Sequence, residues 1–390
     1  MSRGLTVQIP FGKPIIGDQE RAAVAEVLEG STLTHGPRVK AFEAAFAEFT
    51  GAPHAIGTAT CMASLHLAYM AIDLGPGDEV IVPAQTHVAM AHAVEVCGAK
   101  PVFCDCESET GNVDLDQLEG LIGPRTRAIS VVHYLGLPVE MERVLALARA
   151  RDLFVVEDCA IALGARIAGT HVGLHGDVGC FSFYPVKHIT TGEGGMVITN
   201  RAEIAERVSK QRAFGIDRSV LADRRHTGAY DIDLPGLNYR LGETAAAIGV
   251  EQMKRLPEFL AARERNFRAL FEGLAELDHL DVVGSDDQGD RESSHYCLVA
   301  QLRPPLDRRR EELIEALKAR GVGSSVYYPK PLPETRYYAE AYGHRPGSFP
   351  EAARISYGSI ALPVGPHLSG EDIEQVIEGV REVVEMLAET

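Results

Sequence analysis

The sequence predicts an α/β fold, with a large parallel-rich α/β domain over residues 12–250 and a smaller α+β domain over residues 251–390. Short apolar runs alternate with amphipathic stretches through the first half of the chain. Such alternation is typical of strands that pair in parallel through right-handed helical crossovers. The second half has longer helical stretches and fewer strands, and 390 residues are enough for about two domains. Residues 1–11 form a short N-terminal extension.

The predicted elements of the first half follow one another in a regular order. A helix begins after Pro37 and ends before Gly51, because bulky apolar residues recur between them at helical spacing. A second helix is expected over 63–72. The apolar runs that follow suit strands that are buried on both faces. The predicted strands are 79–84, 101–105, 128–134, 153–158, 178–184 and 196–199, and the predicted helices between them are 88–97, 115–122 and 141–149.

In the second half, a long helix is expected over 243–270, with an interruption near Pro257 because proline lacks the amide proton that a helix interior needs. The elements predicted after it are a strand near 297–302, a helix over 308–320, a strand near 324–328 and a last helix over 370–387.

Composition excludes several classes of function. The 38 Lys and Arg residues against 55 Asp and Glu residues give a net charge of −17, which argues against a nucleic-acid or anionic-membrane partner. We see no signal peptide and no apolar run of about 18 residues that would span a membrane. The seven cysteines are scattered and odd in number, as expected of buried thiols in a reducing compartment. We therefore expect a cytoplasmic protein.

Two residues carry the main chemical signal. Asp158 ends a predicted strand, and ligands of open α/β sheets bind beyond the carboxyl ends of strands. Lys187 follows the next predicted strand, in a stretch with few charges. Alone, Asp158 suits a helix cap and Lys187 suits a solvated lysine. Together they suit pyridoxal-phosphate chemistry, which needs a lysine that readily forms a Schiff base and an acid that keeps a pyridine nitrogen protonated. Ser182 adds a hydroxyl donor nearby.

The run FSFYPVKHITTGEGG, with EDCA upstream of it, resembles the signature of the DegT/DnrJ/EryC1/StrS aminotransferases. These are fold-type-I pyridoxal-phosphate enzymes that mostly aminate keto sugars on nucleotide carriers. Three further stretches resemble the family's first helix, its strand–loop–helix over the cofactor and its segment that reaches the neighbouring subunit: THGPRVKAFEAAFAEFTG, GPGDEVIVPAQTHVAMAHAV and GLNYRLGETAAAIGVEQM. The resemblance implies pyridoxal 5'-phosphate as cofactor, glutamate or glutamine as amino donor, a keto-sugar substrate, and a homodimer with shared active sites.

The resemblance also implies a role for individual residues. Lys187 would hold the cofactor as a Schiff base and then move the proton, and Asp158 would pair with the pyridine nitrogen. Ser182 would bind the cofactor phosphate together with Asn238 from the partner chain. His87 stands where the family stacks an aromatic ring on the cofactor, although a histidine at the start of a helix could instead bond to the backbone.

Two positions depart from the family's pattern. The family usually has a Ser/Asn-Gly-Thr turn whose amides bind the phosphate, and this chain has Thr60, Cys61 and Met62 there. The amides of Cys61 and Met62 can still bind an anion at a helix N-terminus, but the threonine hydroxyl is missing. The family tends to place Gln or His three residues after the aspartate, near the ring phenolate. Ile161 stands at this position and cannot donate a hydrogen bond.

Other functions remain as alternatives. A dehydrogenase would need a G-x-G-x-x-G sequence, which is missing, as is a P-loop. A metal hydrolase could use His171, His175 and Asp177, which lie close together in the sequence. A non-catalytic regulatory protein could share the fold, although it could dispense with Lys187. Within the same family, the substrate could be a keto compound without a nucleotide, such as a cyclitol. The run 185–195 resembles members that aminate C4 of a 4-keto-6-deoxy sugar.

Overall fold

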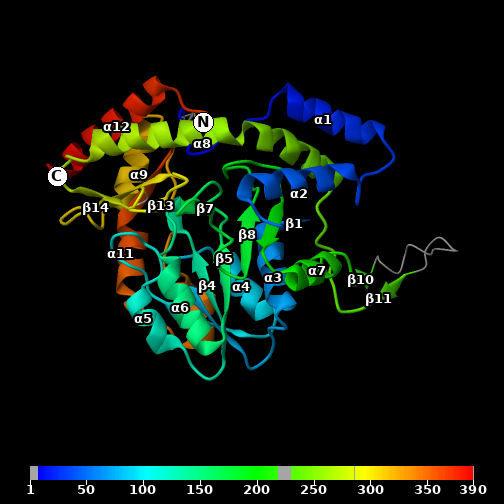
Figure 1. The fold of residues 1–390 in the computed structure, drawn as a ribbon. Helices are drawn as coiled ribbons and strands as arrows, with labels where there is room; N and C mark the ends of the chain where they lie inside the picture. The colour runs from blue at the N-terminus through cyan, green and yellow to red at the C-terminus, as the bar shows by residue number, and fades with distance from the viewer. Residues whose placement is uncertain (1–7, 218–229, 285, 390) are drawn as a thin grey trace.

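The computed structural model describes residues 8–217, 230–284 and 286–389. A seven-stranded sheet forms the centre of the first half, and a smaller three-stranded sheet with long helices forms much of the second half (Figure 1). The predicted α/β class with a large parallel-rich sheet is confirmed. The predicted division into domains over 12–250 and 251–390 remains a prediction, and its boundary falls within one long helix.

The central sheet has the strand order β1-β9-β8-β5-β4-β2-β3. The pairs among β2, β3, β4, β5 and β8 are parallel, whereas β9 pairs antiparallel with both β8 and β1. The parallel strands therefore bring their carboxyl ends to one edge, where ligands of such sheets bind. The strands are β1 (His54–Thr58), β2 (Glu79–Pro83), β3 (Lys100–Cys104), β4 (Thr126–Val132), β5 (Phe154–Asp158), β8 (Val178–Ser182) and β9 (Gly195–Thr199).

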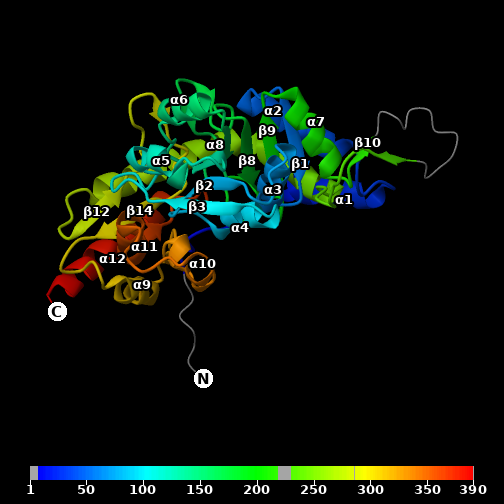
Figure 2. The same ribbon diagram turned by 90° about the horizontal axis from the view of Figure 1, so that it is seen from below.

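Helices cover both faces of this sheet, which explains why its strands are apolar throughout. Figure 2 shows α3 and α4 on one side of the sheet and α5 and α6 on the other. Val80 and Val156 pack toward α3 and α4, whereas Ile129 and Val155 pack toward α5 and α6. The helices of this half are α1 (Asp18–Glu29), α2 (Pro37–Thr50), α3 (Cys61–Ala71), α4 (Val88–Val96), α5 (Leu115–Leu121), α6 (Met141–Arg151) and α7 (Ala202–Gln211).

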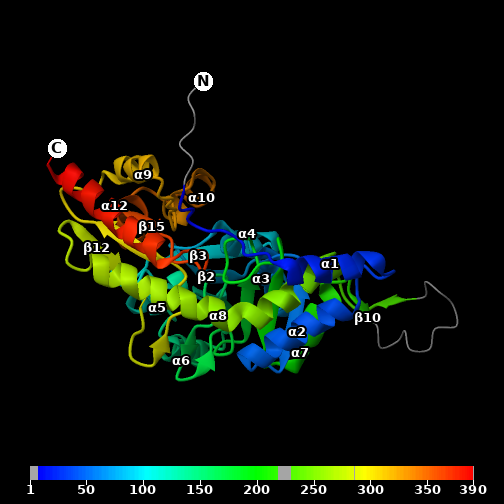
Figure 3. The same ribbon diagram turned by 90° about the horizontal axis from the view of Figure 1, so that it is seen from above.

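A single long helix, α8 (Glu243–Leu274), connects the two halves. The predicted interruption at Pro257 is wrong, because the helix continues through this residue. Proline removes one backbone hydrogen bond, and packing along both ends of α8 outweighs that loss. Figure 3 shows α1 and α2 beside one end of α8 and α12 beside the other, and these helices contact it.

The second half is built on the antiparallel sheet β12-β14-β15, which shares an apolar core with α8, α9 and α12. The predicted strand near 324–328 is wrong, because only Ser325 pairs with a strand, through a single bridge to Ala361. The carbonyl of Tyr327 instead accepts hydrogen bonds from the side chains of Gln85, at 2.8 Å, and Tyr134. The elements are β12 (Leu280–Val283), β14 (Leu298–Leu302), β15 (Ser359–Leu362), α9 (Arg310–Ala319), α10 (Arg336–Tyr342), α11 (Pro350–Gly358) and α12 (Gly370–Ala388).

Short elements complete the fold: β6 (Arg166–Ile167), β7 (Thr170–His171), β10 (Ile216–Asp217), β11 (Asp231–Ile232) and β13 (Arg291–Glu292), with single 3-10 turns at Tyr134–Gly136 and Leu332–Glu334. Within the described ranges, no helix combines the length and the apolar character that crossing a membrane requires.

Candidate active site

The carboxyl ends of β5 and β8 open into a cavity of ≈ 500 Å³. The structure brings six of the predicted site residues together around this cavity: Cys61, Met62, His87, Asp158, Ser182 and Lys187. They come from the starts of α3 and α4, the ends of β5 and β8, and the loop after β8. The cavity therefore lies where an open α/β sheet binds its ligand.

Lys187 lies on a loop that leaves β8 and returns to β9. Hydrogen bonds close the base of this loop, from the amide of Phe183 to the carbonyl of Gly194 at 3.0 Å and from the amide of Thr191 to the carbonyl of Phe183 at 3.1 Å. The Lys187 ammonium nitrogen lies 5.2 Å from the centre of the Tyr296 ring. Lys187 forms no ion pair with any described carboxylate. Its amine is therefore free to react with a ligand in the cavity.

Asp158 is the last residue of β5, and only 4% of it is exposed. Its Oδ1 accepts a hydrogen bond of 2.9 Å from the amide of Ala160, so the capping interpretation and the ligand interpretation hold at the same residue. Burial raises the pKa of Asp158, and the Ala160 amide, Lys187 and His133 oppose this rise. A buried carboxylate of this kind favours a cationic partner in the cavity.

Glu157, the neighbour of Asp158, is a buried carboxylate that the sequence argument missed. It accepts hydrogen bonds from His133 Nε2 at 2.9 Å and from the amides of Gly173, His175 and Gly176 at 2.7, 2.9 and 2.6 Å. Burial alone would raise the pKa of Glu157, but these donors lower it below its ordinary value. Glu157 therefore ties the 173–176 loop to β5, directly beside Asp158.

The predicted metal alternative is not supported by this geometry, since its side chains already bind other groups. His171 accepts a hydrogen bond from the amide of Gly164 at 2.8 Å and donates one to the carbonyl of Val172 at 2.6 Å. Asp177 accepts from the amide of Val155 and from Arg201, both at 2.8 Å. Among the described residues, His171, His175 and Asp177 do not form a group of converging ligands.

The start of α3 presents backbone amides to the cavity. Thr60 caps the helix, its side chain accepting a hydrogen bond of 3.0 Å from the amide of Ala63. Cys61 and Met62 are the first helical residues and line the cavity, as does Ser182 at the end of β8. A helix N-terminus with a nearby hydroxyl is a suitable site for a phosphate.

Gly195 allows β9 to lie close to the start of α3. A Cβ atom at this position would lie 2.4 Å from the carbonyl oxygen of Thr60, so any larger residue would separate β9 from the start of α3.

His87 fulfils both alternatives that the sequence left open, a helix cap and a ring beside the cavity. It caps α4, with Nδ1 accepting a hydrogen bond of 3.2 Å from the amide of Ala89, and it also lines the cavity. Its ring centre lies 6.1 Å from that of Tyr328. Burial, Lys187 and His92 lower the pKa of His87, which favours a neutral, flat ring on this wall.

Sequence reasoning missed the residues that reach the cavity from the second half. Tyr327 and Tyr328 line it, and the hydroxyl of Tyr327 lies 2.8 Å from that of Tyr296, whose ring lies near Lys187. The only local signal was the adjacent tyrosine pair itself. Ile161 is buried in the cavity wall, and its hydrocarbon side chain offers no hydrogen-bond donor there.

Asn238 is not brought to this cavity. It is exposed, forms a bridge to Ala213, and its Oδ1 accepts a hydrogen bond of 2.9 Å from Arg240. A single chain therefore builds the cavity without Asn238.

The remaining residues fit pyridoxal phosphate by their chemistry. The cofactor has a carbonyl for an amine, a ring nitrogen for a carboxylate and a phosphate for amide and hydroxyl donors. Lys187, Asp158 and the start of α3 with Ser182 supply these groups around one cavity.

Comparisons with known proteins agree with this fit. The model of the DegT/DnrJ/EryC1/StrS aminotransferase family matches residues 14–381. The spore coat polysaccharide biosynthesis protein SpsC of Bacillus subtilis is 34% identical over 379 residues, which cover 96% of this chain and 97% of SpsC.

Two solved structures are similar along almost the whole chain. The sugar aminotransferase CalS13 of Micromonospora echinospora has a TM-score of 0.87 and 31% identity, covering 96% of this chain and 100% of CalS13. The PLP form of Spr1654 from Streptococcus pneumoniae has a TM-score of 0.90 and 27% identity, covering 97% of this chain and 99% of that one. The chain thus belongs to the DegT/DnrJ/EryC1/StrS aminotransferase family, as a fold-type-I aminotransferase that uses pyridoxal phosphate.

Proposed function

We propose that this aminotransferase moves an amino group from glutamate or glutamine to a keto sugar on a nucleotide carrier, in particular a 4-keto-6-deoxy sugar. The observation that carries the proposal is the pairing of an amine without an ion-pair partner, on Lys187, with the buried carboxylate of Asp158 at one cavity of ≈ 500 Å³. The sugar-linked relatives SpsC and CalS13 support a sugar as the amino acceptor.

Pyridoxal phosphate supplies the electron sink that lets an amino group leave one carbon and join another. The Nζ atom of Lys187 would hold the cofactor and then carry the proton to and from the reacting carbon. Asp158 would keep the ring nitrogen protonated, and the flat ring of His87 would cover one face. No described carboxylate lies within ion-pair distance of the Lys187 amine, which supports this role because the amine is not already held by a salt bridge.

The phosphate would bind where α3 begins. The amides of Cys61 and Met62 and the hydroxyl of Ser182 would donate to it, with the positive end of the α3 dipole adding a favourable term of about 0.3–1 kcal/mol. The departure at Thr60, Cys61 and Met62 does not remove these amide donors, because backbone amides serve whatever the side chain is.

The rest of the cavity suits a hydroxyl-rich substrate. Tyr184, Glu193 and Tyr327 line it and offer phenol and carboxylate groups. Burial raises the pKa of Tyr327 far above its ordinary value, so its hydroxyl stays protonated and can donate to a sugar oxygen.

The test is a screen of nucleotide-linked keto sugars with glutamate and, separately, with glutamine, read by mass spectrometry for the amino sugar. Lys187→Ala is the control that should give no product. Amination of a free cyclitol ketone but of no nucleotide-linked sugar would replace the proposed substrate class. A purified protein that binds pyridoxal phosphate but aminates neither would favour a non-catalytic role.

We also propose a homodimer with shared active sites, to which Asn238 of a second chain contributes a phosphate donor. The position of Asn238 outside the cavity of its own chain supports this arrangement. The test is complementation: Lys187→Ala and a disabling Asn238 variant are purified separately, shown to be inactive, and mixed so that subunits exchange. Random exchange makes about half of the dimers mixed, each with one intact site, so roughly a quarter of wild-type activity should return. Demonstrated exchange without recovered activity would contradict the shared site.

The cytoplasm is the proposed location. Among the described residues no disulfide joins the seven cysteines, and most of them are buried, which supports a reducing compartment. Immunolocalisation or cell fractionation would test this, and recovery outside the cytoplasm would contradict it.

A further inference from the structure

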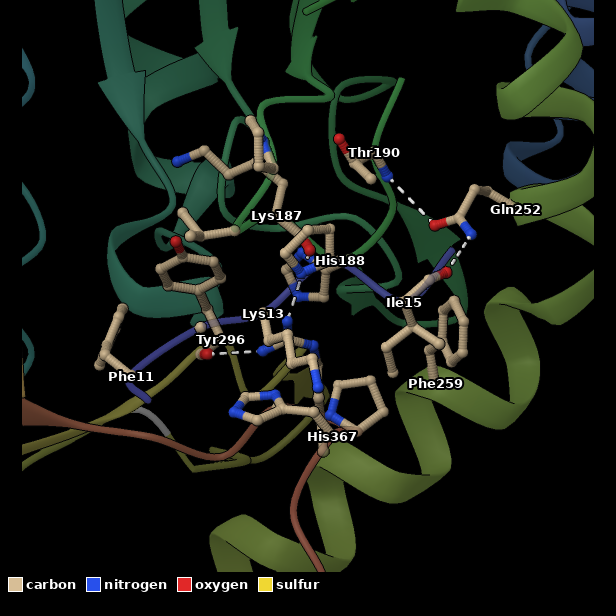
Figure 4. A pocket seen from close by; sticks show the side chains of 17 residues that line it. Phe11, Lys13, Ile15, Lys187, His188, Thr190, Gln252, Phe259, Tyr296 and His367 are labelled. Atoms are coloured by element: carbon tan, nitrogen blue, oxygen red, sulfur yellow. Dashed lines mark hydrogen bonds between the residues drawn. The ribbon is translucent and has the colours of Figure 1, made fainter. Parts of the chain in front are cut away.

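A second, small cavity lies on the other side of the Lys187 loop. It has a volume of ≈ 20 Å³ and lies between residues 11–15, the loop, α8 and residues 365–367 (Figure 4). This volume suits one water-sized or ion-sized occupant and is too small for a cofactor or a sugar. The cavity is therefore separate from the site of the proposed transamination.

The wall of this small cavity is basic. Its lining residues include the bases Lys13, His188, Arg263 and His367, together with Lys187, whose carbonyl accepts a hydrogen bond from Arg263. None of the described aspartates or glutamates lines it. The whole chain has a net charge of −17, so this concentration of bases is local and opposite in sign.

Arg263 is the centre of this positive charge. Only 6% of it is exposed, and it has no ion pair with any described carboxylate. Its guanidinium donates to the carbonyls of Tyr296, at 2.8 Å, and Lys187, at 3.5 Å, while Nε has no partner among the described residues. A guanidinium stays protonated even when it is buried, and a buried charge without a counter-charge is strongly unfavourable. Among the described residues, the Nε–H of Arg263 thus has no acceptor, and its positive charge meets carbonyl oxygens and the Tyr296 ring but no carboxylate.

Two histidines have the same incomplete pairing. His188 and His367 each donate from Nε2 to a backbone carbonyl, of Ser294 at 3.2 Å and of Pro10 at 2.9 Å. Both Nδ1 atoms are buried without a partner among the described residues. Figure 4 shows these two rings, together with Lys13, around the cavity. Three residues that each have a buried, unpartnered polar atom, on three separate segments, therefore line one small space.

We propose that this cavity binds a small monovalent anion of the halide class from solution, with Arg263 as its charge partner. The anion would accept the free Nε–H of Arg263 and neutralise the basic wall. Burial and Arg263 lower the pKa of His188 and His367, and a bound anion would oppose this effect. Proton uptake at Nδ1 of either ring would then turn an unpartnered acceptor into a second donor to the anion. The charged groups that act on these rings are Arg263, Lys13 and Lys187, with His295 near His188 and Asp372 near His367.

Such an anion would link segments that are far apart in the sequence. It would join the N-terminal segment and residues 365–367 to Arg263, which in turn bonds to the carbonyl of Lys187. Halide would therefore stabilise the fold, because a ligand that binds only the folded state raises its stability.

The test uses the wild-type enzyme saturated with pyridoxal phosphate, crystallised in bromide. We expect an anomalous bromide peak in the cavity. In solution, replacing gluconate by chloride at constant ionic strength, from about 10 to about 200 mM, should raise the apparent melting temperature by roughly 2 °C.

Variants identify the site. Arg263→Gln should lose the halide-dependent shift, whereas Arg265→Gln, an exposed arginine on the same helix, should keep it. His367→Gln is the second probe if Arg263→Gln does not fold. Its amide nitrogen can keep the bond to Pro10 while the Nδ1 position is lost, so the shift should shrink.

A water in the cavity at high bromide would overturn the proposal. So would a bromide peak without a chloride-dependent shift in solution, or a shift that persists in both Arg263→Gln and His367→Gln.

Discussion

Asp158→Asn should have opposite effects on activity and on the stability of the cofactor-free protein. The substitution keeps the shape of the side chain and the hydrogen bond from Ala160, because an amide oxygen also accepts. It removes the negative charge that we propose the cofactor ring needs. Without the cofactor, no described basic side chain forms an ion pair with this buried carboxylate.

The sign for the cofactor-free protein follows from the raised pKa of Asp158, which burial causes. A group whose pKa is raised by folding contributes stability below its ordinary pKa, here 3.8, and loses it as the pH rises through the folded value. Above that range the wild type carries a buried charge and the variant does not. The cofactor-free variant should therefore melt at the same temperature as the wild type or higher at neutral pH.

The loss of activity can be estimated from the same carboxylate. An opposite charge within about 4–6 Å changes a pKa by about 1–3 units, and each unit is worth about 1.4 kcal/mol. If that interaction is lost in the transition state, turnover falls by about 10- to 1000-fold.

Asp105→Asn is the matched control. Asp105 directly follows β3, and only 2% of it is exposed, but it does not line the site cavity. Its Oδ1 accepts from the amides of Cys106 and Ala352, both at 2.9 Å, and its Oδ2 from that of Glu351 at 3.1 Å. The asparagine amide has only one acceptor oxygen, so one of the two carboxylate positions can no longer accept a hydrogen bond. This variant should therefore lose about 1–3 kcal/mol of stability and keep its turnover per folded molecule.

The measurements are turnover by mass spectrometry of the amino product and thermal unfolding of the cofactor-free proteins. The reasoning about Asp158 is refuted if Asp158→Asn keeps turnover within about threefold of the wild type. It is equally refuted if the cofactor-free variant is destabilised as Asp105→Asn is, since Asp158 would then act as a structural cap.

Three further predictions concern the same region. Lys187→Ala should bind pyridoxal phosphate non-covalently without turnover, and borohydride should attach the cofactor of the wild type to the Lys187 peptide; an adduct on another lysine would contradict the assignment. Ser182→Ala should weaken cofactor binding about tenfold through the loss of one phosphate hydrogen bond, as measured by absorbance titration. Glu157→Gln should lose about 3–6 kcal/mol in urea unfolding, because one carboxylate oxygen and its two donors lose their pairing. Because folding lowers the pKa of Glu157, this residue contributes to stability above its ordinary pKa of 4.5, and the contribution is lost as the pH falls through the folded value. The free energy of unfolding of Glu157→Gln should therefore depend less on pH in the acid range than that of the wild type. An unchanged acid profile would contradict this.

Local patterns predicted much of the fold because the strands and helices are defined by short-range signals. The last helix was expected over 370–387 and is observed as Gly370–Ala388, after a capping box between Ser369 and Asp372. Asp158 and Lys187 could also be predicted, since each follows a recognisable strand and their chemistry is complementary.

Elements that depend on distant partners could not be predicted in this way. The helix α1 was missed because half of its 12 residues are polar, and one of these, Glu20, is completely buried where α1 contacts α8. Glu20 accepts hydrogen bonds from Gln252 at 2.7 Å and Arg255 at 2.9 Å. The sequence shows a glutamate that should be exposed, and only the packing of α1 on α8 makes it a buried partner. Tyr296 and Tyr327 reach the site for the same reason, from segments without a motif of their own.

Lys187 lies at the boundary between the two cavities, and its two ends belong to different environments. Its side chain lines the large cavity, where its amine has no ion pair, whereas its carbonyl accepts a hydrogen bond from Arg263 beside the small one. Tyr296 links the same pair, because the Lys187 amine and the Arg263 guanidinium lie 5.2 and 5.7 Å from the centre of its ring. We therefore expect a change in the charge around Arg263 to act on the backbone that positions the Lys187 amine, without any contact with the substrate. The effect of an Arg263 variant on turnover should therefore be measured together with its effect on halide dependence, because we expect Arg263 to influence both the Lys187 backbone and the anion.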